Sequence, residues 1–103
     1  MFVVLYSFTV KQNCEKQFIN AWETLTALIY QYEGSLGSRL HHEQQHTYIA
    51  YAQWPDKLTW EHSGHNLPEE AEVFRQQMKD CCTDIQTIHT MEIISDQLQD
   101  KVV

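Results

Sequence analysis

The residues from His42 to His46 have the types and spacing of a zinc-hydrolase motif. They read His-Glu-Gln-Gln-His, and a further imidazole, His41, comes directly before them. On a helix, this pattern places both imidazoles on one face to bind zinc, with the glutamate beside the metal-bound water. Here Gly37 precedes the motif and Thr47-Tyr48-Ile49 follows it at once, so the flanks favour strands. We interpret the imidazoles as solvent-exposed turn residues and predict no functional metal; incidental binding of a transition metal at this turn stays open.

Three thiols are the other residues with chemistry of their own. Cys14, Cys81 and Cys82 are odd in number and lack a Cys-x-x-Cys spacing. They therefore predict neither a disulfide framework nor a zinc knuckle. The adjacent pair is either redox-active or, as we prefer, a pair of small buried side chains at a helix end. No function is assigned to the thiols at this stage.

The composition predicts one small folded domain. The chain has 103 residues, of which 43% are hydrophobic and 20% charged, which is ordinary for a globular domain and too apolar for disorder. We expect a single domain over residues 1–103, with a core over about 1–95 and a polar tail over 96–103. Seven Lys and Arg against fourteen Asp and Glu give a formal net charge of -7, which opposes binding to nucleic acid.

The N-terminal stretch carries no targeting signal that we recognise. It reads Met-Phe-Val-Val-Leu-Tyr-Ser-Phe-Thr-Val, without a basic leader, and no apolar run is long enough to cross a bilayer. We therefore predict a cytoplasmic protein without a membrane partner.

The elements that must position any site begin with a strand over Phe2 to Val10. One face of this strand carries Phe2, Val4, Tyr6, Phe8 and Val10, and the other begins with Val3 and Leu5. A strand that is apolar on both faces needs cover on both. Helices cover one face, and a second subunit is a natural cover for the other.

A helix and a hairpin follow. Asn13 is the expected N-cap, Gly34 fits the left-handed position after the helix, and apolar residues recur at helical spacing between them, namely Phe18, Ala21, Trp22, Leu25, Leu28, Ile29 and Tyr32. The stretch from Gly34 to Pro55 then reads as two extended arms across a polar turn. Pro55 ends the second arm because proline cannot donate to a ladder.

The second half predicts a short helical turn, a helix and a last strand. Asp56 caps the turn, Pro68 opens the helix, which runs to the adjacent cysteines, and the strand spans Ile85 to Ile94. The fold class is therefore α+β: a ferredoxin-like βαββαβ arrangement with a four-stranded antiparallel sheet and helices on one face. Apolar residues on the other sheet face imply a dimer built sheet to sheet or a layer of ligand.

Three segments together resemble the antibiotic biosynthesis monooxygenase family. They are Gly34-Ser35-Leu36-Gly37-Ser38-Arg39-Leu40-His41, Tyr51-Ala52-Gln53-Trp54-Pro55 with Trp60-Glu61, and the helix signature Phe18-x-x-x-Trp22-x-x-Leu25-Thr26. The resemblance covers almost the whole chain. It implies a ferredoxin-like subunit that pairs through sheet faces into a dimeric α/β barrel, with an apolar pocket between sheet and helices.

The resemblance also implies oxidation of a small phenolic or quinol compound by molecular oxygen, without metal or flavin. Such chemistry needs a base, hydrogen-bond donors for an oxyanion and apolar walls that exclude water. The implied base is His62 or His65. The residues expected to bind substrate are Trp60, Arg39, Tyr6 and Tyr51.

Two departures from the family pattern define the alternative. Tyr6-Ser7 stands where the oxygenases and haem-degrading members have an asparagine, and Phe74 to Met78 holds no histidine where the haem branch places its ligand. Haem is therefore not expected. The alternative function is a non-catalytic dimeric α/β barrel that binds a small apolar ligand or serves in a stress response.

Overall fold

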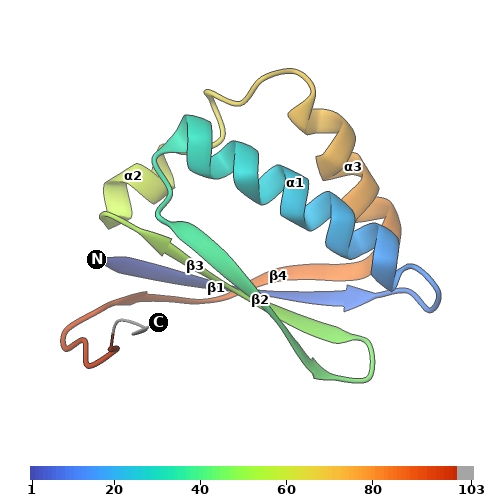
Figure 1. The fold of residues 1–103 in the computed structure, drawn as a ribbon, viewed down its shortest axis with the longest axis horizontal. Helices are drawn as coiled ribbons and strands as arrows, with labels where there is room; N and C mark the ends of the chain where they lie inside the picture. The colour runs from blue at the N-terminus through green and yellow to red at the C-terminus, as the bar shows by residue number, and fades with distance from the viewer. Residues whose placement is uncertain (100–103) are drawn as a thin grey trace.

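The computed structural model describes residues 1–99, which form a four-stranded antiparallel sheet with the helices on one face (Figure 1). The elements in chain order are β1 (Phe2–Val10), α1 (Glu15–Glu33), β2 (Gly37–Gln44), β3 (Thr47–Trp54), α2 (Lys57–Glu61), α3 (Ala71–Cys81) and β4 (Cys82–Glu92). The sheet order is β2-β3-β1-β4. The predicted fold class is confirmed. The last four residues of the predicted polar tail lie outside the described residues.

The core lies between the helices and the helix-facing side of the sheet. Alternate residues of the two central strands point toward α1, and in the antiparallel register Tyr6 is opposite Ala50 and Val4 is opposite Ala52. Phe18 of α1 is fully buried, with ring centroids 5.0 Å from Phe8 and 5.5 Å from Tyr48. The alanines are small, so the sheet leaves room beneath the helix beside this aromatic contact.

The two helix starts differ from the predictions. Helix α1 begins at Glu15, after Cys14, and the expected cap Asn13 instead adopts a left-handed backbone (φ 69°) whose N–H donates to the Glu15 carboxylate at 3.3 Å. Helix α3 begins at Ala71 rather than at Pro68. The reason is a preceding turn, in which the Pro68 carbonyl accepts the Ala71 N–H at 3.0 Å.

The last strand begins three residues earlier than the apolar pattern predicts. Its pairing with β1 extends back to Cys82 opposite Val10, and the Lys11 N–H donates to the Cys81 carbonyl at 2.8 Å. This pairing brings the end of α3 against the end of β1. The strand also ends at Glu92 rather than at Ile94, which is 94% exposed.

No helix within residues 1–99 covers the opposite face of the sheet (Figure 1). Val3 on this face is buried, Leu5, Ile49 and Tyr51 are half-buried, and Met91 of the edge strand is 42% exposed. The predicted apolar character of both sheet faces is therefore confirmed. No helix in the described part of the chain is long and apolar enough to cross a membrane.

Helix α2 is capped as expected. The Asp56 carboxylate accepts hydrogen bonds from the Thr59 N–H and the Thr59 hydroxyl, both at 2.8 Å. These bonds hold the pKa of Asp56 below its ordinary value, chiefly through the backbone N–H. Gly34 lies so close to α2 that a Cβ there would meet the Thr59 methyl at 3.2 Å. The cap and this contact together place Trp60.

Replacing Asp56 tests the cap. Asp56→Ala is expected to lower Tm at pH 7, because the orphan N–H of Thr59 loses its acceptor. The folded-state pKa is depressed, so the stabilisation is present above the unfolded pKa and is lost as pH falls through the folded one. In thermal melts between pH 7 and pH 3, the difference in Tm between Asp56→Ala and wild type should shrink as the pH falls. Glu61→Ala on the same helix is the control, and an equal loss there would contradict a capping role.

Candidate functional site

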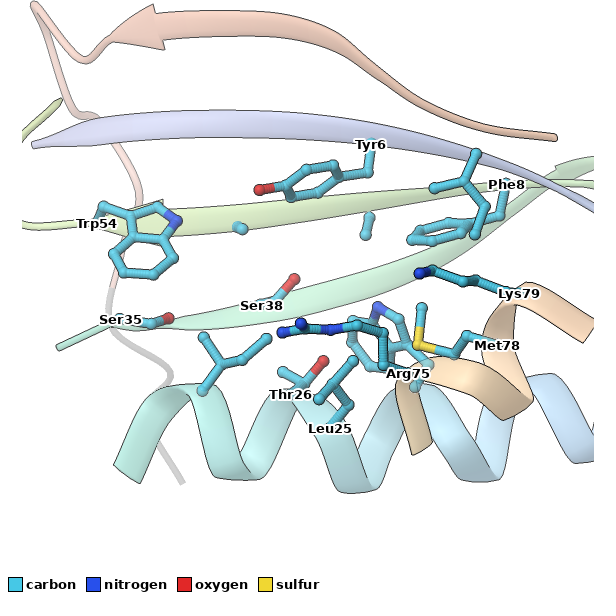
Figure 2. A pocket seen from close by; sticks show the side chains of 15 residues that line it. Tyr6, Phe8, Leu25, Thr26, Ser35, Ser38, Trp54, Arg75, Met78 and Lys79 are labelled. Carbon is cyan, nitrogen blue, oxygen red and sulfur yellow. The ribbon is translucent and has the colours of Figure 1, made fainter. Parts of the chain in front are cut away.

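A cavity of about 360 Å³ lies between the sheet and helices α1 and α3 (Figure 2). Its floor is the pair of small residues Ala50 and Ala52. Its walls are mostly apolar and are formed by Phe8, Trp22, Leu25, Ile29, Met78 and Ile85. Three hydroxyl side chains, Thr26, Ser35 and Ser38, also line it. The size and lining suit an aromatic molecule with a few polar substituents.

Two hydrogen-bond donors lie at one end of this cavity. The Trp54 side chain is 3% exposed, and its buried Nε1–H has no partner among the described residues. Figure 2 shows the Tyr6 hydroxyl and the indole nitrogen of Trp54 turned toward each other along the sheet. A buried N–H without an acceptor costs about 1–3 kcal/mol. An oxygen atom of a bound molecule at this point would give the Trp54 N–H an acceptor.

Trp60 fixes the phenol of Tyr6 from outside the cavity. Its Nε1–H donates to the Tyr6 hydroxyl oxygen at 2.9 Å, and its ring packs on Phe2 with centroids 5.7 Å apart. Burial raises the pKa of Tyr6, and the Trp60 hydrogen bond opposes that rise. The phenol is therefore neutral near pH 7. Because its oxygen already accepts from Trp60, its own O–H remains available as a donor.

Two cations extend from α3 into the same space. Arg75 and Lys79 are four residues apart on the helix, and Figure 2 shows both side chains between the helix and the sheet. Arg75 has one ion pair in the described structure, with Glu72 at 3.7 Å, and both side chains are partly exposed. Such a pair is weak, so the guanidinium stays available to an anion. The lining holds no carboxylate or imidazole among residues 1–99.

The structure brings only some of the predicted site residues together. Tyr6 lines the cavity and Trp60 supports it. His62, the residue after α2, and His65 in the following loop are both exposed, and neither is part of the cavity lining. Their proposed role as base stays a prediction.

Tyr51 and Arg39 lie away from the cavity. Tyr51 is on the opposite sheet face, and its hydroxyl donates to the Gln53 side chain at 3.3 Å. Arg39 is exposed beside an open groove along edge strand β2.

Sequence reasoning did not select Trp54, Arg75 or Lys79. A usable signal was present for the tryptophan: the alternation of β3 places Trp54 on the same face as Ala52, toward the helices. For the cations, the signal was helical spacing, because Arg75 and Lys79 flank the buried Met78 on α3. What the sequence could not show was that the indole N–H has no partner.

The histidines of the hairpin lie outside any helix: His41 and His42 are on strand β2, and His46 is in the turn. His41 and His42 are consecutive residues of β2, so their side chains point to opposite faces. Each ring contacts a backbone carbonyl, that of Ile49 at 3.1 Å and that of Gln45 at 2.8 Å. Across residues 1–99, no three His, Cys, Asp or Glu side chains are placed to hold one metal ion. The predicted hairpin geometry is confirmed.

Glu33, the last residue of α1, anchors the loop that follows α2. Its side chain is 6% exposed, accepts the Gly64 N–H, and accepts the Asn66 side-chain amide at 3.1 Å. This buried carboxylate therefore ties residues 62–67 to α1. The same loop leads into α3, which carries the cavity cations, so Glu33 acts on the site through position rather than contact.

The fold agrees with comparison to known proteins. The chain belongs to the antibiotic biosynthesis monooxygenase family, because its residues 1–79 match the sequence model of that family. A comparison with curated proteins gives no match.

Solved structures of similar proteins superpose over most of the chain. A candidate antibiotic biosynthesis monooxygenase from Nitrosomonas europaea has a TM-score of 0.74 and 10% identity, over 92% of this chain and 100% of that one. SnoaB, a cofactor-independent oxygenase from Streptomyces nogalater solved as a mutant, has a TM-score of 0.72 and 14% identity, over 95% and 97%. Rv0793 from Mycobacterium tuberculosis has a TM-score of 0.71 and 8% identity, over 94% of this chain and 98% of that one. At these identities the likeness shows the fold alone.

The anchoring role of Glu33 is testable. Glu33→Ala leaves the Gly64 N–H and the Asn66 amide without their acceptor, so we expect a loss of about 1–3 kcal/mol in the free energy of unfolding. Hydrogen exchange at the Gly64 amide should accelerate more than exchange in β1. Glu23→Ala, an exposed change on the same helix, is the matched control. Unchanged exchange at Gly64 would contradict the anchoring role.

Proposed function

We propose that this protein is a cofactor-independent monooxygenase that oxidises a small phenolic or quinol compound with molecular oxygen in the cavity beneath α1. The observation that carries the proposal is the unpartnered Nε1–H of Trp54, buried beside the Tyr6 hydroxyl in an apolar space. Two preorganised donors aimed at one point stabilise an oxyanion. Membership of the monooxygenase family supports the same reading.

Substrate binding uses both ends of the cavity. The aromatic body packs against the apolar walls, and its oxygen accepts hydrogen bonds from Trp54 and Tyr6. Arg75 extends from α3 into the cavity, where it would face the bound molecule. A nearby cation favours the ionised form of a phenol, so the substrate loses its proton more readily in the cavity than in water.

The chemical step is electron transfer from the substrate anion to oxygen. The anion loses one electron, and the resulting radical and superoxide combine to form a carbon–oxygen bond. The peroxide anion takes up a proton from solvent to give a hydroperoxide. Its O–O bond then breaks, and the outer oxygen leaves as water with the hydrogen of the oxidised carbon, which becomes a carbonyl. One oxygen atom ends in the product and the other in water. The apolar walls limit the entry of water that would quench the intermediates.

The proton of the substrate leaves toward solvent. No carboxylate or imidazole lines the cavity within the described residues, whereas exposed Lys79 marks the side where the cavity meets water. Because the cavity lowers the pKa of the substrate, the proton can leave without a strong base among the lining residues. His62 and His65 remain the residues that the sequence nominates for the base, and they are tested in the same assay.

Oxygen uptake with a panel of anthrones and hydroquinones tests the proposal. We expect protein-dependent uptake with one quinone formed per oxygen consumed. Arg75→Gln and Trp54→Phe should each lower kcat/KM, by roughly 10²-fold where the transition-state oxyanion loses a donor. The measurement is an oxygen electrode with product absorbance. The absence of uptake across the panel would contradict the function.

The controls separate the site from the surface. Arg39→Gln removes an exposed arginine outside the cavity and should leave kcat/KM within about 2-fold, because charge contacts at exposed positions contribute little. His62→Gln and His65→Gln should also leave kcat/KM within about 2-fold if the substrate loses its proton without an imidazole base. A tenfold or greater loss in either histidine variant would instead support an imidazole base.

The lack of a lining base favours a second candidate function. A non-catalytic barrel that holds an anionic aromatic ligand needs the donors and cations but no proton acceptor. The two functions separate in one experiment: saturable quenching of tryptophan fluorescence by an anthrone, without oxygen uptake, would support the binding protein.

A homodimer through the open sheet face is the expected assembly under both functions. The half-buried Leu5, Ile49 and Tyr51 form an apolar strip on the face that no described helix covers. Burying such a strip against a second copy removes apolar area from water at about 25 cal/mol per Å². Membership of the family supports the pairing, because the family resemblance implies a dimeric α/β barrel.

Sedimentation velocity tests the assembly. Wild type is expected to sediment as a dimer at micromolar concentration, and Ile49→Lys should shift it to monomer by placing a charge in the strip. Leu58→Lys is the control, because Leu58 is 64% exposed on α2 at the other side of the sheet. A wild-type monomer would contradict the dimer.

A further inference from the structure

The three cysteines meet at one end of the molecule, although Cys14 is distant in sequence from the adjacent Cys81 and Cys82. Cys14 precedes α1, Cys81 ends α3 and Cys82 begins β4, and all three are free thiols. The backbone of Lys11 joins the first two: its N–H donates to the Cys81 carbonyl at 2.8 Å, and its carbonyl accepts the Cys14 N–H at 3.1 Å. The Cys14 side chain packs against the core cluster that contains Cys81 and Cys82.

The thiols differ in access to solvent. Cys14 is half-buried, whereas Cys81 is 1% and Cys82 8% exposed. Burial is the main cause that raises the pKa of both buried thiols, to about 11 for Cys82, and the neighbouring Cys14 adds to the rise at Cys81. The thiolate is the reactive form, so the buried pair resists direct attack. A soluble oxidant therefore meets Cys14 first.

We propose that Cys14 and Cys81 are a peroxide-responsive pair that closes an intramolecular disulfide between the start of α1 and the end of α3. The Cys14 thiolate attacks a peroxide oxygen, the O–O bond breaks, and the hydroxide that leaves takes up the proton lost by the thiol to form water. Cys14 is then a sulfenic acid. The sulfur of Cys81 then attacks the Cys14 sulfur. The S–S bond forms, the S–O bond breaks, and the hydroxyl leaves as water with the proton of Cys81.

The adjacent cysteines are the less suitable pair. Consecutive Cα atoms lie about 3.8 Å apart across a trans peptide, whereas disulfides usually join Cα atoms about 4.4–6.8 Å apart. Cys82 also has an extended backbone (φ -117°, ψ 143°) after the helical Cys81, so the chain changes direction between them. Cys14 approaches Cys81 from a separate element and carries no such constraint.

The bond would act on the helix that carries the cavity cations. Helix α3 presents Arg75 and Lys79 to the cavity and ends at Cys81. A covalent link from its last residue to the start of α1 closes a long loop, which constrains the unfolded chain. The oxidised protein is therefore expected to melt at a higher temperature. This inference stands on the thiols alone and does not require the proposed oxygenase activity.

Peroxide treatment of the reduced full chain tests the inference. Hydrogen peroxide should lower the number of titratable thiols from three to one. Peptide mass spectrometry without reductant should find the Cys14 and Cys81 peptides linked, with the loss of two hydrogen atoms. Tm should rise, and dithiothreitol should reverse the change. Three remaining thiols would overturn the proposal.

The variants assign the pair. Cys82→Ser should still form the bond and show the rise in Tm. Cys14→Ser should form no disulfide and show no rise in Tm. Cys81→Ser should accumulate a Cys14 sulfenic acid that dimedone traps. A Cys81–Cys82 link, or disulfide-linked dimers through Cys14, would overturn the assignment.

Discussion

Helix α1 rests on the sheet at one aromatic contact, and the cavity follows from that contact. Phe18 is fully buried between Phe8 and Tyr48, which fixes the height of the helix above the central strands. The facing strand positions beyond it carry Ala50 and Ala52, which cannot reach the helix at that height. A core of larger side chains would have filled the gap. The space is therefore a product of how large and small residues alternate along β3, and α1 spans it (Figure 1).

The far end of that span is held by polar contacts as well as by Ile29, which packs against the buried cluster around Val4 and Trp54. Glu33 ties the loop after α2 to the end of α1, and the Asp56 cap orders α2 beside Gly34. Trp60 on this capped turn then donates to Tyr6. The phenol that lines the cavity thus depends on a chain of contacts that begins at a helix end. Each link orients the next one without entering the cavity, which leaves the donors preorganised before any ligand arrives.

The sequence predicted more of the fold than of the site, for physical reasons that particular residues show. Period-two and helical patterns located β1, α1 and the hairpin, because burial imposes them. Helix starts were missed at Asn13 and Pro68, where short-range hydrogen bonds compete with capping preferences. Tyr6 and Trp60 were selected, but their mutual hydrogen bond spans 54 positions and leaves no local pattern. Trp54 was taken as the end of a strand, because an unpartnered N–H is a property of packing alone.

The charged side chains that line the cavity are positive, whereas the net charge of the chain is negative. The protein carries a formal net charge of -7, yet the cavity lining in the described structure has two cations and no carboxylate. The long-range field of such a protein repels an anion, and salt screens that repulsion beyond about 10 Å. The local guanidinium and the buried donors act at shorter range, where the dielectric is lower. A molecule that enters neutral and ionises inside avoids the long-range repulsion and gains the local stabilisation. A phenol fits that sequence of events better than a substrate that is already charged in water.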